Sequence, residues 1–239
     1  MSDQQERFMK TIGVLGGIGP QATMDFEARV HAISQRLITQ RFNSGYPPMV
    51  VVYHRNPPVL IKEHGLPVLP IQPDPSLLAS AELLGKISDF LVITANGPHL
   101  LEEQIAAAYG GELLSMIAVT LDALQAAGVK RVGLLAFGEP LVYQKPLDDL
   151  GIAHFTIPAA LREPLDEAIG RYMEGTVSPA SQEAARRAVA YLRENGAEWI
   201  VLGCTELPLI LGDDLDQPDL VNPAELLAEA AVARAMEAA

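Results

Sequence analysis

Asp89-Phe-Leu-Val-Ile-Thr-Ala-Asn-Gly-Pro-His-Leu100 aligns without a gap against Glu198-Trp-Ile-Val-Leu-Gly-Cys-Thr-Glu-Leu-Pro-Leu209. Each stretch opens with an acidic residue, continues through four apolar residues, and breaks into small and polar residues before a helical pattern. This pattern is typical of a buried parallel strand that leads into a loop at the edge of a sheet. The only cysteine of the chain, Cys204, lies in the loop of one copy, and Ala95 takes the matching position in the other.

A second pair of similar stretches supports an internal duplication. Thr11-Ile-Gly-Val-Leu-Gly-Gly-Ile-Gly-Pro20 matches Arg131-Val-Gly-Leu-Leu-Ala-Phe-Gly-Glu-Pro140, and the two pairs occur in the same order along the chain. We therefore predict two similar halves. If the halves face each other, positions 95 and 204 meet across the cleft between them.

Strand-like apolar runs alternate with helical patterns along the chain, which is typical of βα units that form a parallel sheet with helices on its faces. The strands are predicted at 11–15, 49–53, 89–94, 113–117, 130–136, 152–157, 198–202 and 218–221. The helices are predicted at 21–38, 76–87, 99–109, 118–127, 161–174, 180–195 and 223–237. The fold class is therefore α/β with two parallel-sheet domains.

The two domains are predicted to span residues 9–117 and 118–221, with a boundary near 117–129. The C-terminal helix, 222–239, is expected to cross back and pack on the first domain. The segment from 54 to 75 contains six prolines and no clear period, so it is predicted to be an ordered loop that could cover a site.

The composition excludes several classes of partner. The 239 residues include 17 basic and 30 acidic side chains, for a net charge of -13, whereas phosphate binding needs clustered Lys and Arg. Nucleic acid and anionic membrane surfaces are therefore not expected as partners. No apolar run reaches the roughly 20 residues of a membrane span, and the N-terminus lacks a secretion signal. With a single cysteine no internal disulfide can form, and we expect a cytoplasmic protein.

The glycine-rich loop Gly16-Gly-Ile-Gly-Pro20 follows the first predicted strand. Its backbone N–H groups, Gly17 included, could contact a small carboxylate, or the glycines could serve only a tight turn. The stretch also fits the relaxed dinucleotide pattern G-x-G-x-x-A, but the second strand offers no acid for a ribose. Arg55, at the end of that second strand, is a candidate carboxylate clamp or a surface ion pair.

Cys204 can be interpreted in two ways. A single buried cysteine is often only a small hydrophobic residue. Its position, however, is at the end of a buried strand, before Thr205 and Glu206 and near a predicted helix N-terminus. Such a helix end favours thiolate, so we predict a thiol pKa that is lowered toward neutrality.

The loop Ala95-Asn-Gly-Pro-His99 offers polar groups for a carboxylate. Asn96 and backbone N–H groups could bind it, and Gly97 would allow its close approach. His99 is expected in a first helical turn, where it could act as a base or cap a neighbouring loop. We find no metal-ligand spacing, no G-x-S-x-G motif and no P-loop.

At three of these stretches the chain resembles the aspartate/glutamate racemase superfamily, specifically its aspartate racemase branch. The matching residues are Ile12–Thr23, the loop Asn96-Gly-Pro-His99, and Ile200-Val-Leu-Gly-Cys-Thr-Glu206. The resemblance covers nearly the full chain in order and spacing.

The resemblance implies two flavodoxin-like domains related by pseudo-twofold symmetry, with a cleft between them, and usually a homodimer. It also implies that no pyridoxal phosphate, metal or nucleotide is needed. In such racemases two facing thiols act on opposite sides of the α-carbon of an acidic amino acid.

The sequence departs from this pattern at the first thiol, because Ala95 can neither accept nor donate a proton. Gly97 stands where the family often has a hydroxyl residue, and the loop 136–140 lacks the usual threonines. Arg162 lies near the position of a lysine that is common after the fifth strand.

We therefore predict a cofactor-independent isomerase, a racemase acting at the α-carbon of an acidic amino acid, with Cys204 as the remaining thiol acid/base. Alternatives are a one-thiol decarboxylase of a substituted malonate, a non-catalytic small-acid-binding protein, or an enzyme in which Ala95 was introduced by design. The predicted substrate-binding residues are Gly17, Arg55, Ala95, Asn96, Gly97, Thr205 and Glu206, with His99 and Arg162 as further candidates.

Overall fold

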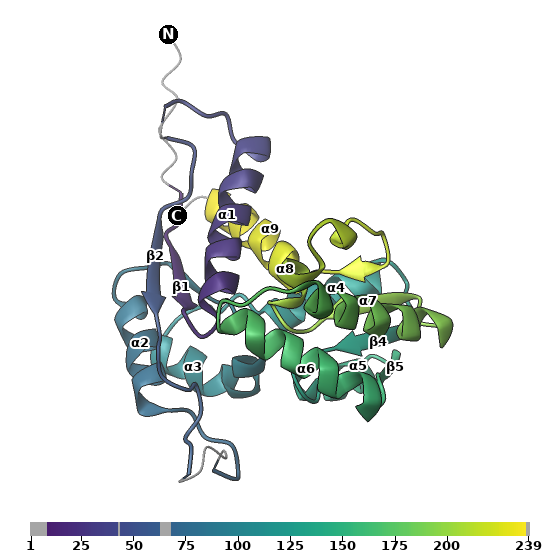
Figure 1. Ribbon diagram of the computed structural model, residues 1–239. Helices are drawn as coiled ribbons and strands as arrows, with labels where there is room; N and C mark the ends of the chain where they lie inside the picture. The colour runs from purple at the N-terminus through teal and green to yellow at the C-terminus, as the bar shows by residue number, and fades with distance from the viewer. Residues whose placement is uncertain (1–8, 43, 63–67, 238–239) are drawn as a thin grey trace.

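Two parallel sheets form the centres of the two halves of the molecule in the computed structural model, which describes residues 9–42, 44–62 and 68–237 (Figure 1). The first sheet has the order β2-β1-β3, and the second has the order β5-β4-β6-β7. The strands of the first sheet are β1 (Ile12–Gly16), β2 (Met49–Tyr53) and β3 (Phe90–Ile93). Those of the second are β4 (Arg131–Leu135), β5 (Ala153–Thr156), β6 (Trp199–Leu202) and β7 (Leu220–Val221). The predicted α/β class with two parallel-sheet domains is confirmed.

The two pairs of similar stretches occupy equivalent places in the two sheets. Ile12 of β1 pairs with Phe90 of β3, and their sequence equivalents Val132 and Trp199 pair in the same register. The acidic residues that open the copies also act alike. Asp89 accepts a hydrogen bond from the Thr11 N–H at 2.6 Å, and Glu198 accepts one from the Lys130 N–H at 2.9 Å. The duplication that the sequence predicts is therefore present in the strand register.

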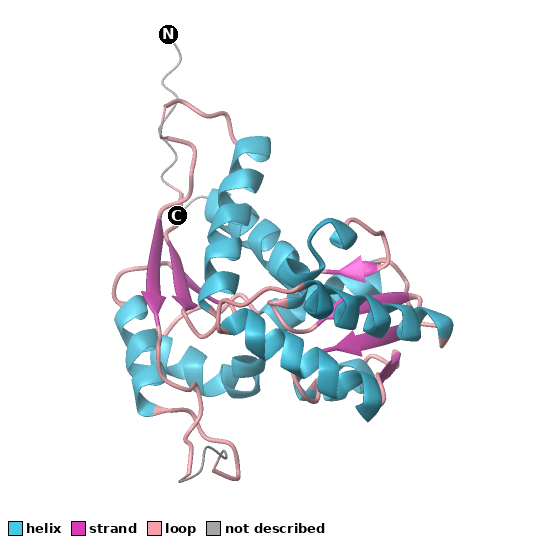
Figure 2. Ribbon diagram, in the orientation of Figure 1, coloured by secondary structure: helices cyan, strands magenta, loops and turns pink. Residues whose placement is uncertain are grey.

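Helices cover both faces of each sheet (Figure 2). In the first half they are α1 (Pro20–Leu37), α2 (Pro75–Gly85), the 3₁₀ helix η1 (Gly97–Leu101), α3 (Glu102–Tyr109) and α4 (Met116–Ala126). In the second half they are α5 (Leu141–Asp149), α6 (Ala159–Met173), α7 (Pro179–Glu194), α8 (Leu207–Leu211) and the 3₁₀ helix η2 (Gly212–Leu215). The chain ends in α9 (Pro223–Met236). Among the described helices, none is long and apolar enough to cross a membrane.

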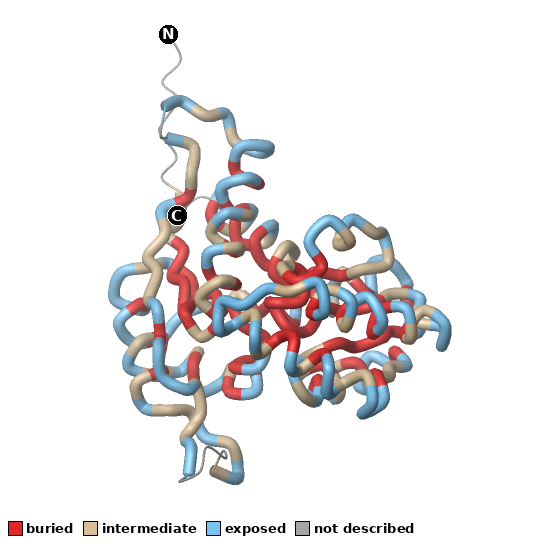
Figure 3. The backbone as a smooth tube through the Cα atoms, viewed as in Figure 1, coloured by how far each residue is buried: buried red, intermediate tan, exposed pale blue. Residues whose placement is uncertain are grey.

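Alternation along the central strands divides the core into layers, because successive side chains point to opposite faces of a sheet. In the first half Val14 packs with α1 and α9, whereas its neighbour Leu15 packs with α2 and α3. In the second half Leu134 packs with α4 and α5, whereas Leu135 packs with α6 and α7. Figure 3 shows these central strands as the most continuously buried part of the chain.

Two local predictions are wrong. The strand predicted at 113–117 is absent, since Leu113 forms only an isolated bridge with Leu91 and α4 begins at Met116. The sequence pattern missed α5, which contains Pro146 in its interior. Proline is a strong signal against a helix, and here packing of Tyr143 and Leu147 in the core overrides it.

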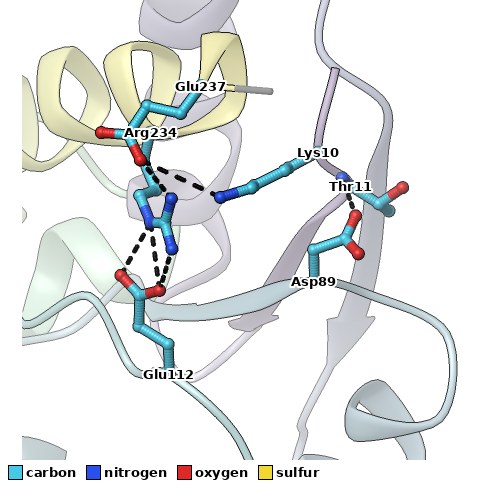
Figure 4. Close-up of polar contacts among 6 residues, drawn as sticks. All are labelled: Lys10, Thr11, Asp89, Glu112, Arg234 and Glu237. Carbon is cyan, nitrogen blue, oxygen red and sulfur yellow. Dashed lines mark hydrogen bonds and ion pairs between the residues drawn. The ribbon is translucent and has the colours of Figure 1, made fainter. Parts of the chain in front are cut away.

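The last helix, α9, returns to the first half. Its Leu227 and Val232 share a core with Phe26 and Val30 of α1. At its end the Ala235 carbonyl accepts a hydrogen bond of 2.9 Å from the Lys10 N–H. Figure 4 shows a group of surface charges at this junction, in which Arg234 pairs with Glu112 and Glu237, and Lys10 lies 3.9 Å from Glu237.

The helix α4 connects the two halves and contributes to both cores. Its Met116 packs in the core of the first half, and its Ile117 and Leu124 pack in that of the second. The predicted boundary near 117–129 lies within or just after this helix. The division into 9–117 and 118–221 stays a prediction. Of the predicted covering loop 54–75, residues 63–67 lie outside the described residues.

Candidate active site

A cavity of about 330 Å³ lies between the two halves. Its wall includes loops that follow β1, β3, β4 and β6, so the carboxyl ends of equivalent strands meet there from both sheets. Ligands of open parallel sheets bind at such strand ends. Pro58, Val59 and Ile71 of the proline-rich segment 54–75 add to the wall.

Most of the predicted site residues line this cavity. They are Ala95, Asn96, Gly97, Cys204, Thr205 and Glu206. The other four, Gly17, Arg55, His99 and Arg162, are not part of the wall. Ala95 and Cys204 come from opposite halves, at the ends of β3 and β6, and each is 9% exposed.

The Cys204 thiol contacts a carboxylate. Its Sγ donates a hydrogen bond to Oε2 of Glu206 at 3.0 Å, and the Thr205 hydroxyl donates to the same oxygen at 3.3 Å. Burial raises the pKa of the Cys204 thiol well above its usual value, and the negative charge of Glu206 raises it further. The backbone N–H groups of Glu206 and Phe137 oppose this shift with a smaller effect.

The predicted lowering of the Cys204 pKa is therefore wrong. The helix after it, α8, has only five residues, and its dipole acts against both burial and an adjacent carboxylate. Cys204 thus rests as a thiol at neutral pH. In this form it can donate a proton at once, and it becomes a base only after its own proton has left.

Replacing Glu206 with Gln is expected to lower the pKa of Cys204, because the substitution removes the negative charge beside the sulfur. The shift can be followed as the rate of alkylation by iodoacetamide against pH, and Cys204 is the only cysteine of the chain. The matched control is Glu139→Gln, since Glu139 also lines the cavity but pairs with Arg162. A Cys204 pKa that stays unchanged or rises in Glu206→Gln would contradict the role given to this carboxylate.

Glu206 also reaches the loop after β1 in the other half. A Cβ atom built on Gly19 would lie 2.3 Å from Oε1 of Glu206, so a larger residue at position 19 would require this carboxylate to move. Gly17 has a different function. Its φ of +79° suits glycine, and its N–H donates to the Thr23 hydroxyl at 2.8 Å. Of the interpretations of the glycine loop, the geometry at Gly17 is that of a structural turn.

The two arginine candidates are engaged outside the wall. Arg55 is exposed, lies over the ring of Tyr53 at 4.9 Å and donates to the Gly17 carbonyl at 3.4 Å. Arg162 pairs with Glu139, which itself lines the cavity, and donates to the Ile157 carbonyl at 3.1 Å.

His99 is a buried scaffold residue. The Met116 N–H donates to its Nε2 at 3.2 Å, so its Nδ1 carries the proton and lies 2.9 Å from the Ala95 carbonyl. Burial lowers the pKa of His99, which favours the neutral ring. Because both ring nitrogens are bonded to backbone, His99 fixes the loop that carries Ala95 and Asn96.

Tyr143 is a site residue that sequence reasoning missed. It comes from α5 in the second half, is fully buried, and donates a hydrogen bond of 2.6 Å to Oδ1 of Asn96 in the first half. This contact leaves the amide nitrogen of Asn96 without a hydrogen-bond partner among the described residues, although it is buried. Such an atom is suited to donate to a bound carboxylate. No sequence signal marked Tyr143, since α5 itself was not predicted.

The part of the chain that the structure describes contains no cluster of three or more His, Cys, Asp or Glu arranged to hold a metal ion. The wall contains a buried thiol with a carboxylate beside it, and it includes Asn96, whose buried amide nitrogen has no hydrogen-bond partner among the described residues. That set can bind a carboxylic acid and transfer a proton next to it.

Comparison with known proteins identifies relatives of this chain. A family model described as Asp/Glu/Hydantoin racemase matches residues 15–231. An uncharacterised protein in the pnlA 3' region of Pectobacterium carotovorum subsp. carotovorum is 36% identical over 107 residues, which are 44% of this chain and 71% of that protein.

Solved structures show the same fold at low sequence identity. The aspartate racemase of Picrophilus torridus superposes with a TM-score of 0.78 at 21% identity, over 95% of this chain and 94% of that one. An aspartate racemase homologue from Pyrococcus horikoshii OT3 gives 0.73 at 22% identity, over 96% of this chain and 100% of that one. Since the family model spans most of the sequence, this chain belongs to the Asp/Glu/hydantoin racemase family.

Proposed function

We propose that the protein is a cofactor-independent isomerase that moves a proton at the α-carbon of a small carboxylic acid, with Cys204 as its single thiol acid/base. The observation that carries this proposal is the Cys204 thiol in the cavity wall, 3.0 Å from Glu206, with the methyl group of Ala95 at the equivalent strand end of the other half. Membership of a racemase family supports isomerase chemistry.

The substrate carboxylate binds to the unpaired amide nitrogen of Asn96 and to backbone N–H groups of its loop. When the Cα–H bond breaks, its electron pair moves toward this carboxylate, and these donors stabilise the negative charge that develops there. The proton goes to the sulfur of Cys204. For this step the thiol first passes its own proton to Glu206, which already accepts its hydrogen bond.

Racemisation needs a second proton on the opposite face of the α-carbon. The methyl group of Ala95 supplies none, and His99 has both ring nitrogens bonded to backbone. We propose that water delivers this proton. Inversion is therefore expected to be slower than exchange of the α-proton with solvent.

Decarboxylation of a substituted malonate is a second candidate, favoured by two observations. The resting thiol form of Cys204 is already a proton donor, and Ala95, at the matching position of the other half, supplies no acid or base. In this reaction the bond from the α-carbon to one carboxylate breaks and carbon dioxide leaves. The electron pair stays on the α-carbon, and Cys204 supplies the proton.

Chiral chromatography of D- and L-amino acids and carbon dioxide release from a panel of substituted malonates separate these reactions. Inversion without carbon dioxide release supports the racemase, and release without inversion supports the decarboxylase. Binding of small acids without either product would contradict both and leave a non-catalytic binding protein. The homodimer and the cytoplasmic location stay predictions.

Replacing Tyr143 with Phe is expected to lower kcat/KM about two- to twelvefold, which corresponds to the roughly 0.5–1.5 kcal/mol of one neutral hydrogen bond. The loss arises because Asn96 can then rotate its amide away from the substrate. The matched control is Tyr109→Phe. Tyr109 is the last residue of α3, lies outside the cavity wall, and donates its hydroxyl proton to the Ser88 carbonyl. Equal kcat/KM values for Tyr143→Phe and wild type would refute the positioning role of Tyr143.

A further inference from the structure

We infer that the substrate carries an apolar substituent on its α-carbon in place of the second carboxylate of an acidic amino acid. This inference rests on the proposed function, because it takes the cavity with Cys204 as the substrate site. The cavity wall is mainly apolar. Its large apolar side chains from the two halves include Ile18, Val59, Ile71, Phe137, Val142 and Met173.

The charge of the wall disfavours a second carboxylate. Glu139 and Glu206 are its charged side chains, and among the described residues that line it there is no Lys, Arg or His. Burying a carboxylate without a positive partner is costly, since the group loses its hydration. The amide of Asn96 can accommodate one carboxylate. Aspartate or glutamate would bring a second one beside Glu206, which forms no ion pair among the described residues, whereas Glu139 pairs with Arg162.

The positive charge of the candidate residue Arg162 is already balanced. Arg162 stands behind the wall, with a side chain that is 19% exposed, and pairs with Glu139. Its guanidinium also donates to the Ile157 carbonyl at 3.1 Å and lies 3.5 Å from the Thr156 hydroxyl. These contacts engage the Arg162 guanidinium with groups of the protein.

Large apolar side chains of the wall are also exposed to solvent. Leu100 is 44% exposed, Phe137 58%, Leu141 50% and Met173 40%. A group of exposed apolar side chains around a concave site marks a binding surface. An aromatic or branched apolar substituent would cover these side chains and gain roughly 25 cal/mol for each Å² of apolar surface buried.

The test is calorimetric binding of two acids that differ in one group, 3-phenylpropanoate and succinate. In succinate a carboxylate replaces the phenyl ring. We expect wild-type protein to bind 3-phenylpropanoate at least tenfold more tightly, which equals about 1.4 kcal/mol. Succinate binding that is as tight or tighter would overturn the inference.

The variant Glu139→Gln tests the neutralisation of Arg162. Without the partner carboxylate, the guanidinium becomes available to a ligand, and succinate affinity is expected to rise roughly tenfold with little change for 3-phenylpropanoate. Adding Arg162→Gln should remove this gain. An unchanged succinate affinity in folded Glu139→Gln protein would contradict this part of the inference.

These experiments test the substrate class and the proposed chemistry independently of each other. Tight 3-phenylpropanoate binding by a protein that exchanges no α-proton would keep the substrate class and remove the proposed chemistry. Cys204-dependent exchange of aspartate, together with tighter binding of succinate, would keep the chemistry and remove the substrate class.

Discussion

Replacing Cys204 with Ala is expected to lower turnover by roughly 10²- to 10⁴-fold, the range that a positioned general acid or base contributes. The reason is that Cys204 is the only thiol of the chain and lies in the wall of the cavity beside Glu206. Turnover is measured as loss of the α-proton or as carbon dioxide release, whichever the wild type shows.

Cys204→Ser is the matched control for this prediction. A serine hydroxyl is close in size and can keep the hydrogen bond to Glu206, but it is a much weaker acid than a thiol. We expect it to be nearly as inactive as Cys204→Ala while thermal unfolding stays close to that of the wild type. If Cys204→Ala retained wild-type turnover, the assignment of Cys204 would be wrong.

Replacing Ala95 with Cys is expected to raise the rate of inversion at the α-carbon by roughly 10²-fold or more, because it adds a thiol acid/base. Ala95 lies two residues after β3 as Cys204 lies two residues after β6, and both residues line the cavity from opposite halves. The second thiol would replace water as the proton donor on the other face. Chiral chromatography of both enantiomers measures the gain.

Gly97→Cys provides the control for position. Gly97 lines the same wall, and a Cβ built there meets nothing within 4 Å, so the variant should fold. Its thiol lies two residues beyond position 95 along the loop and should not support inversion. An equal gain in the inversion rate of both variants would contradict the opposed arrangement of positions 95 and 204. So would an Ala95→Cys variant that still exchanges the α-proton but inverts no faster than the wild type.

The placement of the site could be predicted because it follows from strand order. The two similar stretches predicted equivalent strands, and the carboxyl ends of parallel strands meet at one edge of a sheet. This argument placed Ala95, Asn96, Cys204 and Glu206 at one site, and the cavity contains all four. It also predicted two sheets, and the register of β1 with β3 and of β4 with β6 shows their equivalence.

The electrostatics of the thiol could not be predicted in the same way. The direction of the Cys204 pKa depends on its burial and on the rotamer of Glu206, and neither is encoded in local spacing. The sequence did predict a helix N-terminus near Cys204, but the helix that begins there, α8, has only five residues.

Contacts between segments that are distant in the sequence could not be predicted either. Tyr143 meets Asn96 across the two halves from α5, a helix that was not predicted and that contains Pro146. His99 meets Met116 at the start of α4, where the sequence had indicated a strand. Each contact depends on how the halves pack, which no local pattern specifies.

Proton NMR in D₂O with Cys204→Ala as the control tests the central claim most directly, on a panel of α-amino acids, 2-substituted carboxylic acids and malonates. We predict that one deuterium appears at the α-carbon of the product. In the α-amino and 2-substituted acids, this deuterium should appear before any inversion. The Cys204→Ala variant should incorporate no deuterium. Deuterium incorporation at the wild-type rate in Cys204→Ala would contradict the claim that a single thiol carries out the proton transfer.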